Sequence, residues 1–401
     1  MSVLSDEVLV EPLPPSPGAD LTWNQVVGRD ALIQEWWQLL GRQSLRVLGP
    51  RRTGKTCALR LLEHETPQDR AVLRMSTLQG LDPSPAAFVK RVYEDASALR
   101  PAWKRWPNYL NEAAALVSKL GIEVGSFKVA ANLPSFHWWT LLAQIFTDVE
   151  QAAAAEDRLA VFVWDEVTLY LYDLVRKEAH DEAGLLLDRL RTVRQTCPHI
   201  RMVFAGSIGL DEVLRELKKQ GYGNDPVNDM KSCPLPPLDE ADAQVLALRL
   251  LRSFESDGAN AEALARHLAR IAEGHPFLLH HLAVELRQRS FRTAFEADRI
   301  LTALIEGPED ALELSHYHDR LSRYLGPRTS AAEDLLDQLA LQPRASLTEL
   351  VAATGLVRAD AQSLLRLLER DYYVEQSPDG DRPWCIKTAV LRRWWRHERG
   401  L

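Results

Sequence analysis

Apolar residues follow two different patterns along this chain. Up to about residue 237, short apolar runs of strand length alternate with longer segments of helical period, and the runs occupy 44–48, 71–75, 159–164 and 200–205. Apolar runs of this length are typical of parallel strands covered on both faces. The pattern predicts an α/β domain over 21–237. From 238 to 327 the apolar spacing is helical throughout, which predicts a separate helical domain.

The last segment, 328–401, has a third pattern. A helix over 331–341 is followed by two helical stretches separated by a tight turn at Gly355, the second running from 358 to 370. Short alternating runs at 372–374 and 384–386 then predict a hairpin, and the chain closes on an amphipathic helix. This order predicts a winged helix-turn-helix domain.

Two further segments carry weaker signals. Residues 1–20 contain four carboxylates, four prolines and no Lys or Arg, which predicts an extended, poorly ordered arm or a docking segment for a partner. Within 101–135 we expect a helix over 111–120 and a short hairpin over 122–129.

One stretch carries a strong chemical signal. After the strand at 44–48 the chain reads Gly-x-x-x-x-Gly-Lys-Thr and then becomes helical. In this context the pattern predicts a phosphate-binding P-loop, because glycines let the backbone amides turn toward an anion at a helix N-terminus. Lys55 would reach the β- and γ-phosphates and Thr56 would ligate Mg²⁺. The expected nucleotide-binding set here is Gly49, Pro50, Arg51, Arg52, Thr53, Gly54, Lys55, Thr56 and Cys57.

A second chemical signal follows the strand at 159–164. Asp165 and Glu166 stand at its carboxyl end, where ligands bind in open α/β sheets. We expect Asp165 to hold Mg²⁺ and Glu166 to polarise an attacking water. Ser207 follows the next strand, and it either senses the γ-phosphate or the water, or simply begins a turn.

Composition narrows the class of protein. The net charge is -8, half of it in residues 1–20, which gives no global support for nucleic-acid binding. Four scattered cysteines without metal-ligand spacing predict reduced thiols in a cytoplasmic protein. No apolar run reaches the roughly 20 residues that a membrane span needs.

Whether the last domain binds DNA stays open from its charges. Residues 328–401 hold eleven Lys/Arg and eleven Asp/Glu, whereas a DNA reader usually shows a basic surface. The candidate recognition helix nevertheless offers Arg358, Gln362, Ser363 and Arg366, and the last helix carries Arg392, Arg393, Arg396 and Arg399. Duplex DNA and a partner protein are both candidate partners.

Several landmarks now fall in one order: Val-Gly-Arg-Asp at 27–30, the P-loop, Val-Trp-Asp-Glu at 163–166, Ala-Gly-Ser at 205–207 and Gly-His-Pro-Phe at 274–277. With these landmarks the chain resembles the STAND ATPases within the AAA+-like branch of P-loop NTPases, and the prokaryotic group often called archaeal-type ATPases. The resemblance implies a five-stranded parallel core, a helical lid and a winged helix. It also implies ATP, with Gly28 and Arg29 near the adenine and His275 and Pro276 contacting the nucleotide from the lid.

The chain departs from the common AAA+ pattern on the lid helix, where His280 and His281 stand in place of a sensor arginine. Arg191 and Arg194 are candidates for acting in trans across an oligomer, or are surface charges. Arg51 and Arg52 contact the nucleotide or a neighbouring subunit, or have structural roles.

Three functional hypotheses follow. The first is an ATP-dependent molecular switch that hydrolyses ATP slowly and whose nucleotide state controls either its own assembly or a partner. The second is a DNA-binding AAA+ ATPase similar to origin initiators or transposition regulators. The third, a scaffold that binds nucleotide without turnover, is disfavoured by the intact Asp165-Glu166 pair.

Overall fold

A computed structural model describes residues 11–19, 21–103, 138–207, 210–254, 259–290, 293–378 and 382–401. The contacts divide the chain into two compact units. The core unit comprises 31–48 and 55–235, and the C-terminal unit comprises the residues through 30, the loop 49–54 and residues 236–401. The helix and hairpin expected within 101–135 lie outside the described residues.

The core unit is built on a five-stranded sheet whose paired strands are all parallel. The strand order is β2-β3-β4-β1-β5, with β1 at Leu45–Leu48, β2 at Ala71–Thr77, β3 at Leu159–Asp165, β4 at Ile200–Gly206 and β5 at Lys231–Pro234. The expected five-stranded parallel α/β core is confirmed.

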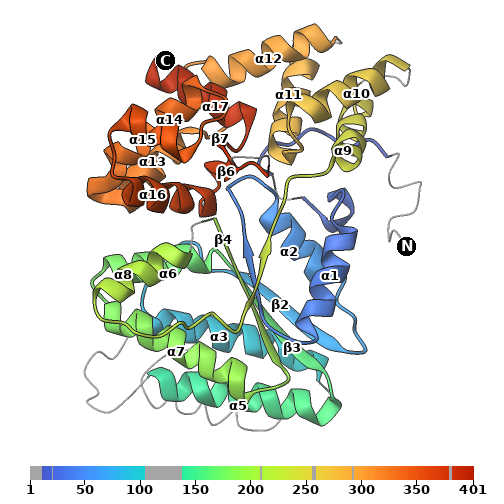
Figure 1. Cartoon of the computed structure of the whole chain (residues 1–401). Coiled ribbons are helices and arrows are strands. Elements are labelled where there is room, and N and C mark those ends of the chain that lie inside the picture. The colour runs from blue at the N-terminus through green and yellow to red at the C-terminus, as the bar shows by residue number, and fades with distance from the viewer. Residues whose placement is uncertain are drawn as a thin grey trace. The chain divides into compact units, whose positions relative to one another are not determined.

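Helices cover both faces of this sheet (Figure 1). Along β3, Phe162 and Trp164 belong to one apolar cluster with the helices α3, α5, α6, α7 and α8, whereas the alternate residues Val161 and Val163 are buried outside that cluster. Successive side chains of a strand point to opposite faces, so the apolar run of β3 is explained by burial on both sides. The helices of the unit are α1 (Asp30–Leu40), α2 (Lys55–His64), α3 (Pro85–Leu99), α5 (Trp138–Glu156), α6 (Val167–Arg176), α7 (His180–Thr196) and α8 (Leu210–Lys219).

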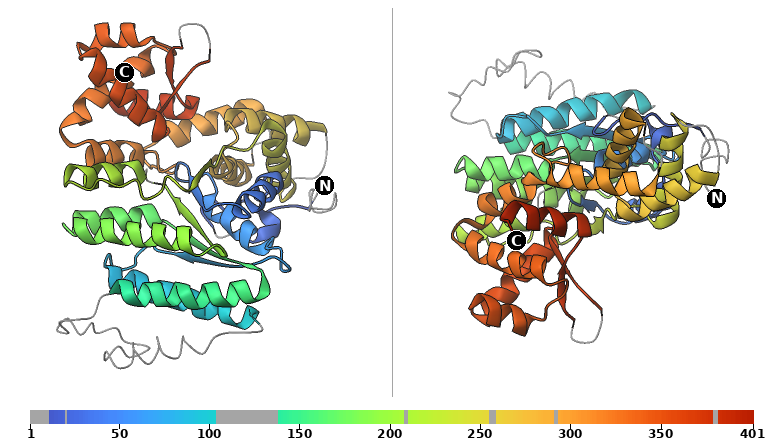
Figure 2. Two further views of the ribbon diagram at one scale, coloured as in Figure 1. Left: turned by 60° about the horizontal axis from the view of Figure 1, so that its bottom comes forward. Right: turned by 90° about the horizontal axis from the view of Figure 1, so that it is seen from above.

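The C-terminal unit is mostly helical and ends in a helix-turn-helix region with a small hairpin, as the sequence predicts (Figure 2). Gly355 ends α15 with a left-handed φ of 70°, which allows the tight turn into α16. The elements are α9 (Glu240–Arg252), α10 (Ala259–Ile271), α11 (Pro276–Arg289), α12 (Ala294–Glu306), α13 (Ser315–Leu325), α14 (Thr329–Leu341), α15 (Leu347–Thr354), α16 (Arg358–Arg370), β6 (Val374–Gln376), β7 (Trp384–Ile386) and α17 (Ala389–Arg399).

One continuous apolar cluster runs through this unit from α9 to α17. It includes Leu282 of α11, Leu336 of α14 and Trp395 of α17. The expected division between a lid and a winged-helix domain at 327/328 therefore falls inside a shared core, and that boundary stays a prediction. No helix among the described residues is long and apolar enough to cross a membrane.

The described part of the N-terminal segment differs from a poorly ordered arm. Leu13 is 2% exposed and belongs to the apolar cluster of the C-terminal unit. Its amide donates to the carbonyl of Arg249 over 2.9 Å, and the Arg249 guanidinium donates in turn to the carbonyl of Glu11 over 2.9 Å. One apolar residue, one backbone hydrogen bond and one hydrogen bond from the Arg249 side chain thus hold 11–13 on α9.

Candidate functional site

The first turn of α2 meets the end of β3 in the core unit. The Thr56 hydroxyl donates to the Asp165 carboxylate over 2.6 Å. Lys55 and Asp165 are both buried, at 5% and 4% exposed, and Cys57 is half-buried on the same helix. The structure therefore brings together the two residues that the sequence predicts as metal ligands.

The donor atoms here fit Mg²⁺. A hydroxyl and a carboxylate are the hard oxygen ligands that this ion prefers, and Mg²⁺ in nucleotide sites usually takes only one or two protein ligands, with water and phosphate completing its shell. In the described part of the chain no group of three or more His, Cys, Asp or Glu is placed to hold a metal. Thr56 and Asp165 thus fit an ion that arrives with a phosphorylated substrate.

Glu166 lies immediately beyond β3 in the left-handed backbone region, with φ at 57°. The Ser207 amide and hydroxyl face its carboxylate at 3.3–3.4 Å. Burial and the neighbouring Asp165 raise the pKa of Glu166, while the Lys55 charge and the Ser207 contacts act to lower it. A carboxylate with a raised pKa is a better base at neutral pH.

Ser207 reaches Glu166 because β4 ends very close to α6. A Cβ placed on Gly206 would lie 1.9 Å from the Thr168 hydroxyl oxygen, so only glycine fits there. Thr168 is fully buried, and its hydroxyl has no hydrogen-bond partner among the described residues. Sequence reasoning missed Thr168, although its place two residues after Glu166 was a signal.

A buried carboxylate anchors the end of β3 from the opposite direction. Asp95 of α3 is 1% exposed and accepts hydrogen bonds from the Trp164 indole over 3.1 Å and the Ser76 hydroxyl over 2.9 Å. Arg74 lies 3.6 Å from the same carboxylate. Burial raises the pKa of Asp95. Trp164 precedes Asp165 directly, so this network fixes the strand that carries the acidic pair.

The loop 49–54 contacts other residues of the C-terminal unit, to which it belongs. Arg52 pairs with the Glu313 carboxylate through two nitrogens, the Nε contact being 2.9 Å, and its guanidinium lies 4.7 Å from the centre of the Phe277 ring. Within the loop, the buried Thr53 hydroxyl donates to the Pro50 carbonyl over 2.9 Å. Of the alternatives for Arg52, these contacts favour a structural role. Arg51 is exposed.

Gly28, Arg29, His275 and Pro276, which were expected near the nucleotide, all belong to the C-terminal unit. A Cβ on Gly28, whose φ is 68°, would lie 2.4 Å from Asp242, so α9 packs directly on this glycine. Arg29 is 5% exposed and lies close enough to His275 for its charge to lower that pKa. Burial is the larger cause and brings the His275 pKa to about 4. Pro276 begins α11, as its missing N–H permits.

His280 of α11 contacts the N-terminal segment. Its Nδ1 accepts a hydrogen bond from the Ser16 amide over 3.0 Å, so the neutral imidazole holds the N-terminal segment. Burial lowers the pKa of His280 to about 4. Its neighbour His281 packs against the Phe277 ring with centroids 4.5 Å apart.

Arg194 does not serve as an exposed charge. Its side chain is 3% exposed and makes a bidentate pair with Asp229, both contacts being 2.9 Å. The expectation that it acts in trans, or is a surface charge, is therefore not supported. Arg191, one turn earlier on α7, is half-buried.

In the helix-turn-helix region, α16 presents a polar face. Gln362, Ser363 and Arg366 are exposed, and so is Arg358, which donates to the Thr348 hydroxyl over 3.2 Å. Arg366 pairs with Glu369 at 2.8 Å and lies over the Trp384 ring of the hairpin. All four residues that the sequence singled out on this helix are therefore reachable from solvent.

Most arginines of α17 form contacts with other helices of the C-terminal unit. Arg392 donates to the carbonyl of Ala340 over 3.0 Å, and Arg399 pairs with Asp337 at 3.0 Å. Arg393 pairs with Glu306 of α12 at 2.7 Å. Three of the four arginines predicted to form a basic cluster thus contact neighbouring helices, whereas the guanidinium of Arg396 is exposed and pairs with no side chain among the described residues.

Comparison with known proteins agrees with this architecture. Residues 332–378 match a family model described as the IclR helix-turn-helix domain. Among solved structures, the Walker-type ATPase of Pyrococcus abyssi is 16% identical with a TM-score of 0.62, over 97% of this chain and 99% of that one. At this identity the likeness shows a shared fold along nearly the whole chain.

Two further solved structures are more distant. The ORC2 protein of Aeropyrum pernix in its ADPNP-ADP complexes is 9% identical with a TM-score of 0.48, over 99% of both chains. DnaA of Aquifex aeolicus bound to AMPPCP is 14% identical with a TM-score of 0.32, over 87% of this chain and 91% of that one. These scores are too low to carry an argument. Among curated proteins, none matches this chain.

Proposed function

We propose that this chain binds ATP·Mg²⁺ and hydrolyses it slowly, as a molecular switch of the STAND type within the AAA+-like ATPases. The observation that carries this proposal is the contact of Thr56 with Asp165, next to Glu166 and its Ser207 partner. A P-loop helix start beside an acidic pair is the arrangement that phosphoryl transfer from a nucleotide needs. ATP in preference to GTP rests on the sequence resemblance.

In this proposal each residue has one task. Lys55 stabilises the phosphate charge, and Thr56 with Asp165 holds Mg²⁺, which when bound neutralises the charge on the phosphates. Glu166 orients a water in line with the γ-phosphate, and Ser207 keeps its carboxylate in position. Positioning and charge stabilisation supply most of the rate enhancement in this chemistry.

Two substitutions separate binding from turnover. Lys55→Ala should weaken ATP binding by about two orders of magnitude, because a charge-assisted contact to phosphate is lost. Glu166→Gln should keep ATP affinity and lower turnover by about a hundredfold or more. Matched controls are Lys219→Ala and Glu178→Gln, which alter exposed residues of the same unit. Undiminished ATP binding by the Lys55 variant would refute the proposal.

A second candidate function is binding of duplex DNA by α16. The helix-turn-helix family match and the exposed face with Arg358, Gln362, Ser363 and Arg366 favour it. Arg358→Ala combined with Gln362→Ala should weaken a salt-sensitive gel shift with duplex DNA. Equal binding by the wild type and this variant would exclude α16 as the contact.

An assembly switch and a DNA-loading ATPase differ in the conditions under which they form oligomers. Light scattering on the Glu166→Gln variant with ATP and Mg²⁺ should show a larger mass without DNA if the chain is an assembly switch. Growth in mass only with duplex present would instead support loading on DNA. A cytoplasmic location is part of the same proposal.

A further inference from the structure

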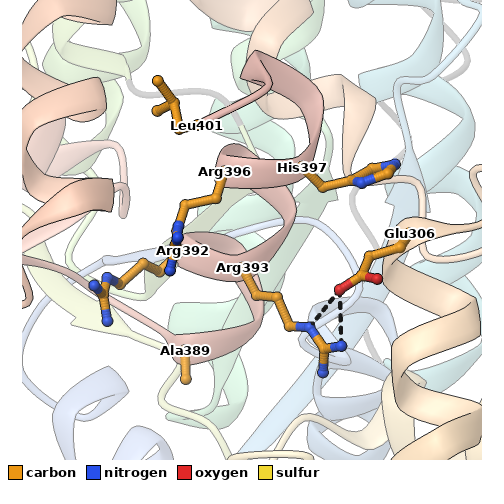
Figure 3. A pocket seen from close by; sticks show the side chains of 7 residues that line it. All are labelled: Glu306, Ala389, Arg392, Arg393, Arg396, His397 and Leu401. Atoms are coloured by element: carbon orange, nitrogen blue, oxygen red, sulfur yellow. Dashed lines mark hydrogen bonds and ion pairs between the residues drawn. The ribbon is translucent and has the colours of Figure 1, made fainter.

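A cavity of about 520 Å³ opens between α12 and α17 within the C-terminal unit. Figure 3 shows its lining side chains, which are Glu306, Ala389, Arg392, Arg393, Arg396, His397 and Leu401. Its volume is in the range of small-ligand sites, about 300–1,000 Å³. Such sites are mostly apolar, whereas three of the seven residues that line this one are arginines, so the fitting ligand is an anion.

The cavity is built from one face of α17. Its lining positions on that helix recur with the spacing of a single helical stripe, from Ala389 to His397. The opposite stripe, with Leu391, Trp394 and Trp395, is buried in the apolar core. The buried stripe fixes the rotation of the helix, so the arginines are held toward the cavity.

The charges in the cavity do not balance. The Arg393 charge is neutralised by Glu306, with which it forms the contacts drawn in Figure 3. Arg392 donates to the neutral carbonyl of Ala340 and keeps its charge. Arg396 is exposed, and none of the described residues forms a hydrogen bond or ion pair with its guanidinium.

Two nearby groups oppose this surplus only in part. Glu273 approaches α17, where its carboxylate accepts from the amides of Ala389 and Val390 at 2.9 and 3.2 Å, so its full negative charge lies at the N-terminal end of the helix, about two turns from Arg396. The C-terminal end of a helix adds about half a negative charge. The two guanidinium charges of Arg392 and Arg396 still exceed the sum of these contributions, which is about one and a half negative charges.

We propose that this cavity binds a phosphate group through Arg396, assisted by Arg392, at a site separate from the P-loop. A guanidinium presents parallel N–H donors that match two phosphate oxygens. The phosphate comes either from the backbone of duplex DNA or from a free phosphorylated molecule.

The test uses the full chain carrying Lys55→Ala, which removes the main phosphate contact of the P-loop. Calorimetric titration with inorganic pyrophosphate should give binding that Arg396→Gln weakens about tenfold or more. Arg266→Gln, an exposed arginine of α10 outside the cavity, is the matched control and should leave the affinity unchanged. Arg392 is left intact because it also contacts α14.

The pyrophosphate titration tests the cavity independently of ATP binding at the P-loop. No pyrophosphate binding at millimolar concentration, or equal affinity with and without Arg396→Gln, overturns it. ATP binding by the Lys55→Ala variant would instead count against the proposed function and leave this cavity untouched.

A second arm identifies the source of the phosphate. Duplex DNA binding is followed by fluorescence anisotropy over a series of salt concentrations. If the DNA backbone occupies the cavity, Arg396→Gln should reduce the slope of log affinity against log salt by about one, and pyrophosphate should compete. If a free phosphorylated molecule occupies it, duplex affinity is unchanged while pyrophosphate binding is lost.

Discussion

Glu166 combines an unfavourable backbone conformation with opposing influences on the pKa of its carboxyl group. It has a left-handed backbone, a conformation that costs a non-glycine residue about 1–3 kcal/mol and is concentrated at functional sites. Burial and Asp165 favour its neutral form, whereas Lys55 and Ser207 favour the carboxylate. The pKa of Glu166 is raised on balance, which suits a group that orients or accepts a proton from water.

Ser207→Ala tests this balance. The Ser207 hydroxyl acts to lower the pKa of Glu166, so its removal should raise that pKa further. Because the carboxylate is the active form, the acid limb of turnover against pH should move to higher pH, and turnover should fall by roughly tenfold. Steady-state ATP hydrolysis across pH gives both values. Ser207→Thr keeps the hydroxyl and serves as the control; an acid limb that stays in place would contradict the assigned contact.

At the scale of elements, the approach of β4 to α6 is what delivers Ser207 to Glu166. Gly206→Ala should destabilise the core unit by about 1–3 kcal/mol, because the added Cβ meets the Thr168 hydroxyl at 1.9 Å. The double substitution with Thr168→Ala should recover part of this loss, since the oxygen is gone but the Thr168 Cβ position still lies 3.0 Å away.

Calorimetric unfolding of the two single variants and the double variant measures the coupling. Thr168→Ala alone should be nearly neutral, because its hydroxyl has no partner in the part of the chain that the structure describes. Strictly additive losses would show that Gly206 and Thr168 do not touch.

At the scale of the whole molecule, the sequence pattern predicted the features that are determined by residues close together in the chain. The strand and helix around the P-loop, the acidic pair after β3 and the helix-turn-helix all follow from spacing and turn residues. The edge strand β5, with Lys231 and Pro234, was not predicted, because it has little apolar character and lies at the border of the sheet.

Contacts between residues far apart in the sequence were not predicted either. The pair of Arg52 with Glu313 joins residues 261 positions apart, and the bond of Ser16 to His280 joins residues 264 positions apart. Neither partner carries a local signal of the other. Arg392 likewise appeared as part of a basic cluster, and only the packing of α17 shows that it contacts backbone carbonyls.

The bond from Ser16 to His280 makes the fastening of the N-terminal segment dependent on pH. The folded state keeps His280 neutral down to a pKa of about 4, whereas an unfolded chain protonates it near the ordinary 6.5. The unfolded state therefore binds more protons between these values, and the stability due to this histidine is present above pH 6.5 and is lost as the pH falls toward 4.

Protonation of His280 also puts a hydrogen on Nδ1 and breaks the bond to Ser16. Hydrogen exchange of the Ser16 and Leu13 amides should accelerate over this window in the wild type. His280→Asn, which accepts without titrating, should exchange with much less pH dependence after correction for intrinsic rates. An equal pH response in both proteins would show that another group governs the segment.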